Sequence, residues 1–179
     1  MYGLNNTQFS SLVPPYQLPG ATWSVSPDLP EGLSIDTVSG IISGTPTEVI
    51  GNTTYTISGV ADTSSITFDF NLQVLEDTDR DGLPNELPED YPVEGDLVED
   101  LDDDGDGALD TAETGTGIYN GTGDMGTDPL DPDTDDDGIC DGPNAVPPVC
   151  IAGPDSNPVG TGPLGPTVLV NNTETTPIN

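Results

Sequence analysis

The 179-residue chain has no histidine, no lysine and a single basic residue, Arg80, against 33 aspartates and glutamates. An enzyme built on it would have to work with carboxylates alone, as some sugar-cleaving enzymes do. Such a site also needs aromatic faces, and the core requires most of the one tryptophan, five tyrosines and three phenylalanines. We therefore expect no catalytic activity. The net charge of −32 repels nucleic acid and anionic lipid and attracts divalent cations or basic partners.

Long apolar runs and cysteines are also scarce. No run approaches the roughly 20 residues that span a bilayer, and the first ten residues lack the features of a signal peptide, so we expect no direct membrane insertion. The two cysteines, Cys140 and Cys150, would form a disulfide in an extracellular setting. Two free buried thiols are the alternative. Two sulfurs without histidine are too few for a zinc site.

The acidic residues are concentrated in one half, since 26 of the 33 lie in residues 76–155. Before residue 76 the pattern alternates with period two, in residues 22–26, 54–61 and 66–75. In the last of these, one face carries apolar side chains only: Ile66, Phe68, Phe70, Leu72 and Val74. Alternation with turn residues between the runs predicts a small antiparallel β-sandwich, with Trp23 as its largest core side chain.

Residues 23–47, "WSVSPDLPEGLSIDTVSGIISGTPT", followed by "YTISGVA" and "ITFDFNLQV", resemble the Ig-like and cadherin-like domains of prokaryotic surface proteins. The resemblance covers about residues 16–76. It implies an Ig-like β-sandwich used as a spacer or adhesive module, and a secreted or cell-surface location. The matching positions are Leu29, Pro30, Gly32, Leu33, Gly40, Ile42, Gly44, Thr45 and Pro46.

After residue 76 the motif D-x-D-x-D-G-x-x-[DN] occurs three times, beginning at residues 77, 102 and 133. Residues 102–113, "DDDGDGALDTAE", extend it to the full signature of a 12-residue calcium loop. Calcium takes six to eight oxygen ligands, and a glycine at position 6 allows the required sharp turn. Solvated disorder is the alternative for such a run. The ligands predicted here are Asp102, Asp104, Asp106, the carbonyl of Ala108, Asp110 and Glu113.

The first and third loops are less complete, because their twelfth positions are Pro88 and Asn144. In the first, Glu86 or Glu89 would have to replace the missing carboxylate. In the third, Asp128, Asp131 or Asp155 would do so, although each equally suits an ordinary turn. The remaining predicted ligands are Asp77, Asp79, Asp81 and Asn85 in the first loop, and Asp133, Asp135, Asp137, the carbonyl of Ile139 and Asp141 in the third.

No amphipathic helix flanks these loops, which excludes an EF-hand. The stretches "DTDRDGLPNE", "DDDGDGALDTAE" and "GTDPLDPDTDDDGICDG" resemble thrombospondin type 3 repeats, over about residues 77–158. The resemblance implies an irregular chain with little helix, wrapped around calcium ions. We expect at least two ions, and three or more with every loop occupied.

The expected organisation is an N-terminal segment (1–15), a sandwich (16–76), calcium-binding repeats (77–158) and a C-terminal tail (159–179). The favoured function is a calcium-binding structural or adhesive module of a secreted or cell-surface protein, with calcium in an architectural role and a surface glycan or protein as ligand. The alternative is a self-assembling subunit of an extracellular filament or surface layer, in which "TQFSSLV" (7–13) and "TVLVNN" (167–172) exchange strands. Four Asn-x-Ser/Thr sites are either glycosylated or due to chance: Asn5, Asn52, Asn120 and Asn171.

Overall fold

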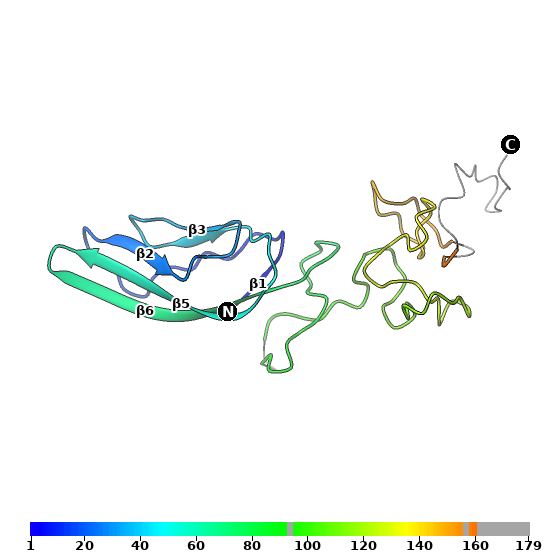
Figure 1. Ribbon diagram of the computed structural model, residues 1–179, viewed down its shortest axis with the longest axis horizontal. Helices are drawn as coiled ribbons and strands as arrows, with labels where there is room; N and C mark the ends of the chain where they lie inside the picture. Colours follow the sequence, from blue (N-terminus) through cyan, green and yellow to red (C-terminus); the bar gives the residue numbers. More distant parts are fainter. Residues whose placement is uncertain (93–94, 156–157, 161–179) are drawn as a thin grey trace. The chain divides into compact units, whose positions relative to one another are not determined.

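The computed structural model describes residues 1–92, 95–155 and 158–160. The chain divides into two compact units, Met1–Asp100 and a second that begins at Leu101. The described residues form six strands and no α-helix, which confirms the mostly-β prediction (Figure 1). Accordingly, they contain no helix suited to crossing a membrane.

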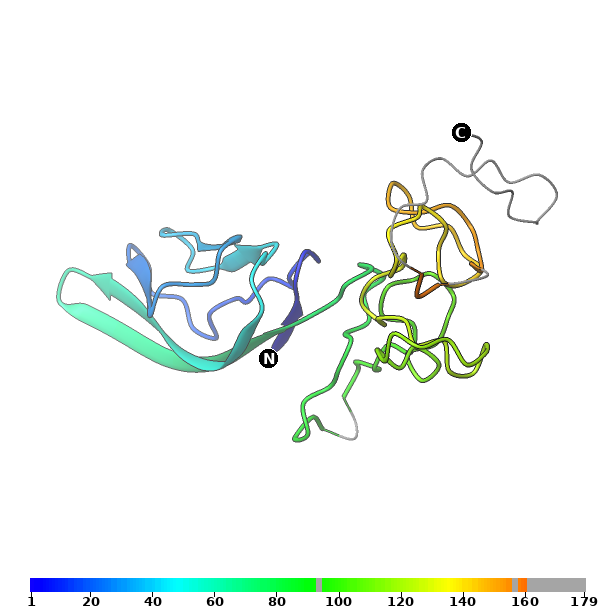
Figure 2. The same cartoon turned by 45° about the vertical axis from the view of Figure 1, so that its right-hand side comes forward.

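The first unit contains all six strands, arranged in two sheets. The larger sheet has the order β1-β6-β5-β2, and the smaller pairs β3 with β4. Strands β5 and β6 form one long curved hairpin, visible in Figure 2. The bounds are β1 Tyr2–Leu4, β2 Thr22–Ser26, β3 Leu33–Ile35, β4 Ile42–Gly44, β5 Ile50–Ala61 and β6 Ser64–Leu75.

One strand pair departs from the antiparallel arrangement expected from the sequence. Strand β1 runs parallel to β6, with Gly3 opposite Val74. A parallel pair needs a crossover between its strands, and here nearly the whole domain separates β1 from β6 in sequence. Short-range alternation cannot reveal such a pair.

The segment of residues 7–13, considered above for strand exchange, lies along β4 within the same domain. The N–H groups of Leu12 and Ile42 donate to each other's carbonyl oxygens over 3.0 Å, and Phe9 N–H donates to Gly44 O, also over 3.0 Å. The second segment considered for exchange, residues 167–172, lies outside the described residues.

The core includes Trp23 as its largest fully buried side chain, as the sequence predicted. Along β6 the expected apolar face is confirmed, because Leu72 and Val74 are fully buried and the aromatic positions before them are half-buried. The buried members of the core are Phe9, Ala21, Trp23, Leu33, Ile42, Tyr55, Ile57, Leu72 and Val74.

Two glycines make room for the Trp23 ring. A methyl group built on Gly59 would lie 2.8 Å from Cζ3 of Trp23, and one on Gly40 would lie 2.7 Å from Cδ2. Real carbon atoms do not approach each other so closely. The indole therefore packs directly on the backbone of β5, and any larger residue at Gly59 must displace it.

We expect Gly59→Ala to lower the free energy of unfolding of the first unit by about 1–3 kcal/mol, the usual cost of overpacking a core. The matched control is Gly51→Ala on the same strand, where an added methyl group meets no atom within 4 Å. That change should stay within about 0.5 kcal/mol of the wild type. Urea unfolding followed by Trp23 fluorescence measures both. Equal stability of the two variants would contradict the packing argument.

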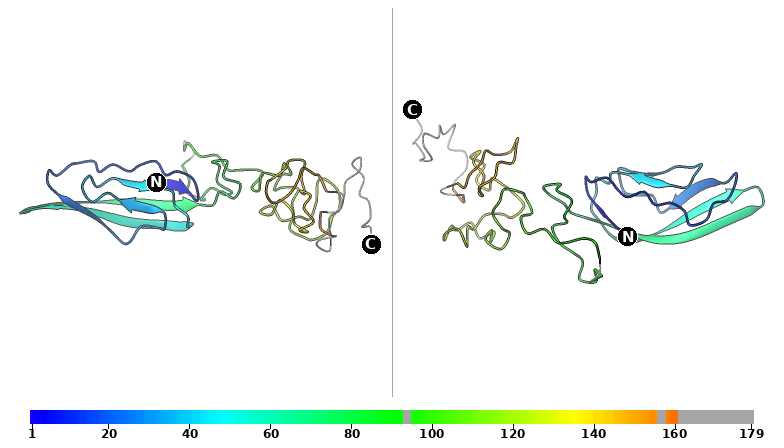
Figure 3. Two further views of the ribbon diagram at one scale, coloured as in Figure 1. Left: turned by 90° about the horizontal axis from the view of Figure 1, so that it is seen from above. Right: turned by 180° about the vertical axis from the view of Figure 1, so that it is seen from behind.

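The second unit has a different construction. Its described residues contain no named strand, only isolated bridges such as Ile139 with Ile151. Figure 3 shows this part of the chain as successive loops. Few apolar side chains are buried here, among them Ala108, Met125 and Ile139, whereas many carboxylates are. Apolar burial is therefore a small part of what holds this unit together.

Candidate metal centre

The three acidic loops share one backbone conformation, although their sequences differ outside the motif. In each loop, the residue at position 4 and the glycine at position 6 have a positive φ angle, which is the left-handed backbone conformation. At position 6 only glycine adopts this conformation without strain. The φ angles are 68°, 76° and 60° for Arg80, Gly105 and Asp136, and 99°, 89° and 88° for Gly82, Gly107 and Gly138.

Position 9 closes each loop through two hydrogen bonds. Its backbone N–H donates to the carbonyl of the residue just before the loop, as from Asp110 to Leu101 over 3.1 Å. Its side-chain oxygen accepts the N–H of position 2, as Asp110 does from Asp103 over 2.9 Å. Asn85 and Asp141 repeat both bonds in the first and third loops. An amide serves as well as a carboxylate here, which explains Asn85.

Positions 1, 3 and 5 turn their carboxylates toward the middle of each loop. Oδ1 of position 3 accepts the N–H of position 5, and Oδ1 of position 5 accepts that of position 7. For Asp104 and Asp106 these distances are 3.1 and 2.7 Å. In each loop, one oxygen from each of the three carboxylates lies within 4.8 Å of the other two. The groups are Asp77, Asp79 and Asp81; Asp102, Asp104 and Asp106; and Asp133, Asp135 and Asp137.

An outer acidic residue lies at the same place beside each loop. The N–H of Glu113, position 12 of the second loop, donates to the carbonyl of position 8, Leu109, over 3.2 Å. Asp100 donates in the same way to Pro84 over 2.9 Å, and Asp155 to Cys140 over 3.0 Å. All three outer side chains are buried. The structure thus indicates Asp100 and Asp155 as counterparts of Glu113.

Sequence reasoning missed Asp100, because it lies 15 positions after Asn85, position 9 of its loop. The substitutes that it suggested, Glu86 and Glu89, are both exposed. Among the residues considered for the third loop, Asp155 is buried, Asp131 is half-buried and Asp128 is exposed. Ala108 and Ile139, predicted to offer carbonyl groups, are both buried.

A fourth group joins two loops, and no sequence motif indicated it. Oxygens of Asp106, Glu113 and Asp141 lie within 4.8 Å of one another, and all three side chains are at least 98% buried. Thr127, also absent from the sequence-based ligand set, donates its hydroxyl to Oε1 of Glu113 over 2.9 Å. No described group donates a hydrogen bond to Oε2 of Glu113, Oδ1 of Asp141 or Oδ2 of Asp104.

The electrostatics of the second loop follow from this burial. Burial first, and the neighbouring Asp106 carboxylate next, raise the pKa of Asp104 from 3.8 to about 8. Burial likewise raises the pKa of Glu113 from 4.5 to about 8 and that of Asp141 from 3.8 to about 7. Hydrogen bonds to the charged form or a nearby positive charge are needed to keep a buried carboxylate ionised at neutral pH. The sequence has no basic residue after Arg80, so a bound cation would have to supply that charge.

The first loop is attached to the sandwich and belongs to the same compact unit. The hydroxyl of Thr7 donates to Oδ2 of Asp77 over 3.0 Å, and Asp77 N–H donates to Oδ1 of Asn5 over 2.9 Å. Oδ1 of Asp77 accepts no hydrogen bond from a described group, although the residue is 1% exposed. Position 1 of this loop is therefore fixed by the Ig-like domain.

The four glycosylation candidates differ in their surroundings. Asn5 is half-buried and bonded as just described, whereas Asn52 and Asn120 are exposed. Asn120 also donates its side-chain amide to Asp124 over 2.8 Å. Asn171 lies outside the described residues.

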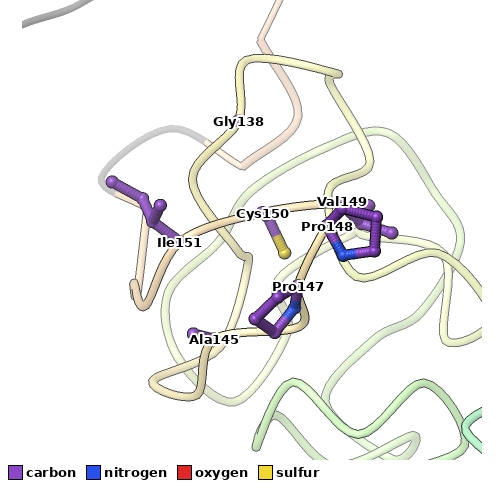
Figure 4. Close-up of a pocket in the computed structure, with 7 residues that line it drawn as sticks. All are labelled: Gly138, Ala145, Pro147, Pro148, Val149, Cys150 and Ile151. Atoms are coloured by element: carbon purple, nitrogen blue, oxygen red, sulfur yellow. The ribbon is translucent and has the colours of Figure 1, made fainter.

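The predicted disulfide is confirmed, because Cys140 and Cys150 are joined. Backbone hydrogen bonds align the two arms of its loop, from Cys140 N–H to Ile151 O over 2.9 Å and from Ile151 N–H to Gly138 O over 3.0 Å. Figure 4 shows Cys150 between the turn that carries Pro147 and Pro148 and the following Ile151. The bridge therefore fixes the chain next to Asp141, position 9 of the third loop.

Comparison with known proteins supports the Ig-like part of the chain. The family model described as "Putative Ig domain" matches residues 2–75, so this domain includes β1. No curated protein sequence matches the chain.

Two similar solved structures come from Bacteroides fragilis NCTC 9343. One is described as a putative alpha-galactosidase (29% identity), the other as a putative alpha-galactosidase/melibiase (23% identity). Each match has a TM-score of 0.35 and covers 41% of this chain, but only 15% of the matched Bacteroides chain.

Replacing both Cys140 and Cys150 by serine should destabilise the second unit by about 2–3 kcal/mol, the loop-closure value for so short a loop. Differential scanning calorimetry in calcium measures the change. As a control, a reducing agent should lower the melting temperature of the wild type to that of the variant and leave the variant unaffected. An unchanged melting temperature in the variant would show that the loop does not depend on its bridge.

Without a cation, the buried carboxyls should make the second unit sensitive to alkali. In the folded unit Asp104, Glu113 and Asp141 keep their protons up to pH values of about 7–8, whereas the unfolded chain releases them near pH 4. Their raised pKa values favour the folded state below about pH 4, and this contribution is lost as the pH rises through the folded values. In chelator, the melting temperature should therefore fall between about pH 5 and pH 8.

Calorimetry of chelator-treated protein across this pH range tests the expectation. Asp104→Asn removes one titrating group and should make the fall shallower. Asp128→Asn, at an exposed position, should leave it unchanged. A melting temperature that increases with pH in chelator would contradict the assignment.

Proposed function

We propose that the acidic loops bind calcium ions and that the chain is a calcium-stabilised structural or adhesive module of a secreted or cell-surface protein. One observation carries the proposal. Three loops repeat the same left-handed positions and the same inward-facing carboxylate triad, and buried oxygens of Asp77 and Asp104 accept no hydrogen bond from a described group. A cation at the middle of each loop would occupy these oxygens.

The chemistry of the ligands favours calcium over other metals. The chain offers carboxylate, amide and carbonyl oxygens but no imidazole, and both of its cysteine sulfurs are in a disulfide. Such oxygen sets suit hard cations. Irregular loops with several carboxylates accommodate the six to eight ligands of calcium more readily than the strict octahedron of magnesium. Extracellular modules of this kind bind calcium at about 10⁻⁴–10⁻³ M.

The role proposed for calcium is architectural. Calcium sensors of the EF-hand type work by moving helices, and the described residues contain none. Binding to the folded form alone stabilises it by mass action, so calcium would order the second unit and the first loop. The Ig-like domain at residues 2–75 and the disulfide suit an extracellular location, where calcium is abundant. The adhesive ligand would be a surface glycan or protein.

Asp104→Ala combined with Asp106→Ala tests the central site. The variant should lose at least one bound ion, and in calcium the chain after Leu101 should become sensitive to protease, because the remaining carboxylates repel each other without compensation. The matched control, Glu89→Ala with Asp90→Ala, removes the same charge from two exposed positions and should bind calcium like the wild type. Unchanged protease resistance in the first variant would refute the architectural role.

Calorimetric titration of chelator-stripped wild type with calcium tests the proposal as a whole. Saturable binding of several ions, with a change in circular dichroism, is expected. No binding at millimolar calcium would refute it. Light scattering recorded in parallel addresses the filament alternative, which requires growth of large particles on addition of calcium.

A further inference from the structure

The group formed by Asp106, Glu113 and Asp141 differs from the three loop triads. Asp106 and Glu113 are positions 5 and 12 of the second loop, whereas Asp141 is position 9 of the third. Their oxygens lie within 4.8 Å of one another, the same limit that holds for the three loop triads. Backbone contacts hold the two loops together here, because Asn144 N–H donates to the carbonyl of Asp106 over 2.6 Å.

Glu113 and Asp141 each use one carboxylate oxygen in a hydrogen bond and keep the other available for coordination. Thr127 occupies Oε1 of Glu113, and Thr134 N–H donates to Oδ2 of Asp141 over 3.1 Å. The second oxygen of each side chain, Oε2 and Oδ1, is buried and accepts no hydrogen bond from a described group. Ordinary structural carboxylates that are 2% and 0% exposed would have both oxygens satisfied.

Asp106 belongs to two groups at once, this one and the triad of the second loop. Its Oδ1 accepts Ala108 N–H, and its Oδ2 accepts the N–H of Gly142 in the third loop. Each carboxylate oxygen has two acceptor sites, so these bonds leave both oxygens able to coordinate a metal. One carboxylate can therefore bridge two cations, one on each side.

Charge balance supports two cations over one. The two groups that share Asp106 together contain five carboxylates: Asp102, Asp104, Asp106, Glu113 and Asp141. A single divalent ion would leave three negative charges in a largely buried site without a basic side chain. Two divalent ions would leave a single negative charge. Backbone N–H groups that donate to these carboxylates can stabilise that charge.

We propose that a second calcium ion is held between the second and third loops by Asp106, Glu113 and Asp141, with the Asp106 carboxylate shared with the ion of the second loop. This inference rests on the proposed calcium-binding function and extends it. The ion would join residues from two loops that are 31 residues apart in sequence. Calcium would then fold the second unit as one body, because neither loop could complete this site alone.

The test counts calcium ions bound at saturation, by equilibrium dialysis against millimolar calcium. Asp141→Asn keeps the bond from Thr134 but replaces a coordinating oxygen by an NH₂ group, and Glu113→Gln makes the same exchange opposite Thr127. Asp141→Asn should bind one ion fewer than the wild type, and Glu113→Gln, which also alters position 12 of the second loop, should lose at least that same ion. The double variant should bind as many ions as Glu113→Gln alone, because the ion that depends on Asp141 is already lost there. Fewer ions in the double variant would overturn the proposal.

Two further variants separate this ion from those of the individual loops. Asp136→Asn makes the same chemical change at exposed position 4 of the third loop, which is neither a predicted ligand nor a member of the groups described above, and should retain every ion. Asp135→Asn should remove the ion of the third loop, so its combination with Asp141→Asn should lose two ions. Loss of only one ion in that combination would mean that Asp141 serves the third loop alone, and would overturn the proposal.

A crystal structure of the wild type grown in calcium gives a measurement that does not depend on variant folding. The anomalous map should show an ion in contact with Glu113 and Asp141. Its absence, with ions present in the loop triads, would overturn this inference and leave the proposed function standing. A wild type that binds no ion at all would refute the proposed function itself.

Discussion

Repulsion between buried carboxylates, in a unit without any positive side chain, is the constraint on which the second half of this protein depends. Backbone N–H groups offset part of this repulsion, since successive amides of a loop donate hydrogen bonds to the loop's own carboxylates. They leave oxygens of Asp104, Glu113 and Asp141 without a hydrogen bond from a described group. Protons can neutralise these groups at acid pH, whereas at neutral pH a bound cation would compensate their charge. In our proposal, folding and ion binding are therefore one process.

The two halves of the chain therefore obtain their stability from different sources. The first buries Trp23 and the apolar faces of β5 and β6 between two sheets, and this hydrophobic contribution needs no ligand. The second buries few apolar groups and relies on repeated loops, a disulfide and, in our proposal, calcium. The first loop draws on the folded domain as well as on its own acidic residues, because Thr7 and Asn5 of the Ig-like domain form hydrogen bonds with Asp77. Its geometry is then supported by the domain even before an ion binds.

Sequence patterns were most informative where the interactions are local. Alternation predicted β2 with its exact limits, the inner face of β6 and the burial of Trp23. The Asp-x-Asp-x-Asp-Gly motif predicted three loops because the left-handed glycine and the inward carboxylates lie within nine residues. The same reasoning failed for Asp100, which returns to the first loop over 15 residues, and for β1, which pairs with β6 from the other end of the domain. Neither position carries a local signal.

The sequence by itself determined that this chain has a β-rich half and an acidic half, where each loop lies, and that no basic side chain can neutralise the second unit. These properties depend on composition and short spacings, which folding does not change. The tertiary structure alone decided which acidic residues converge. Asp106, Glu113 and Asp141 meet because the backbone N–H groups of Gly142 and Asn144 donate to the carboxylate and the carbonyl of Asp106, which joins the third loop to the second. Backbone donors are the same at every residue, so no pattern of side chains could have indicated where these contacts would form.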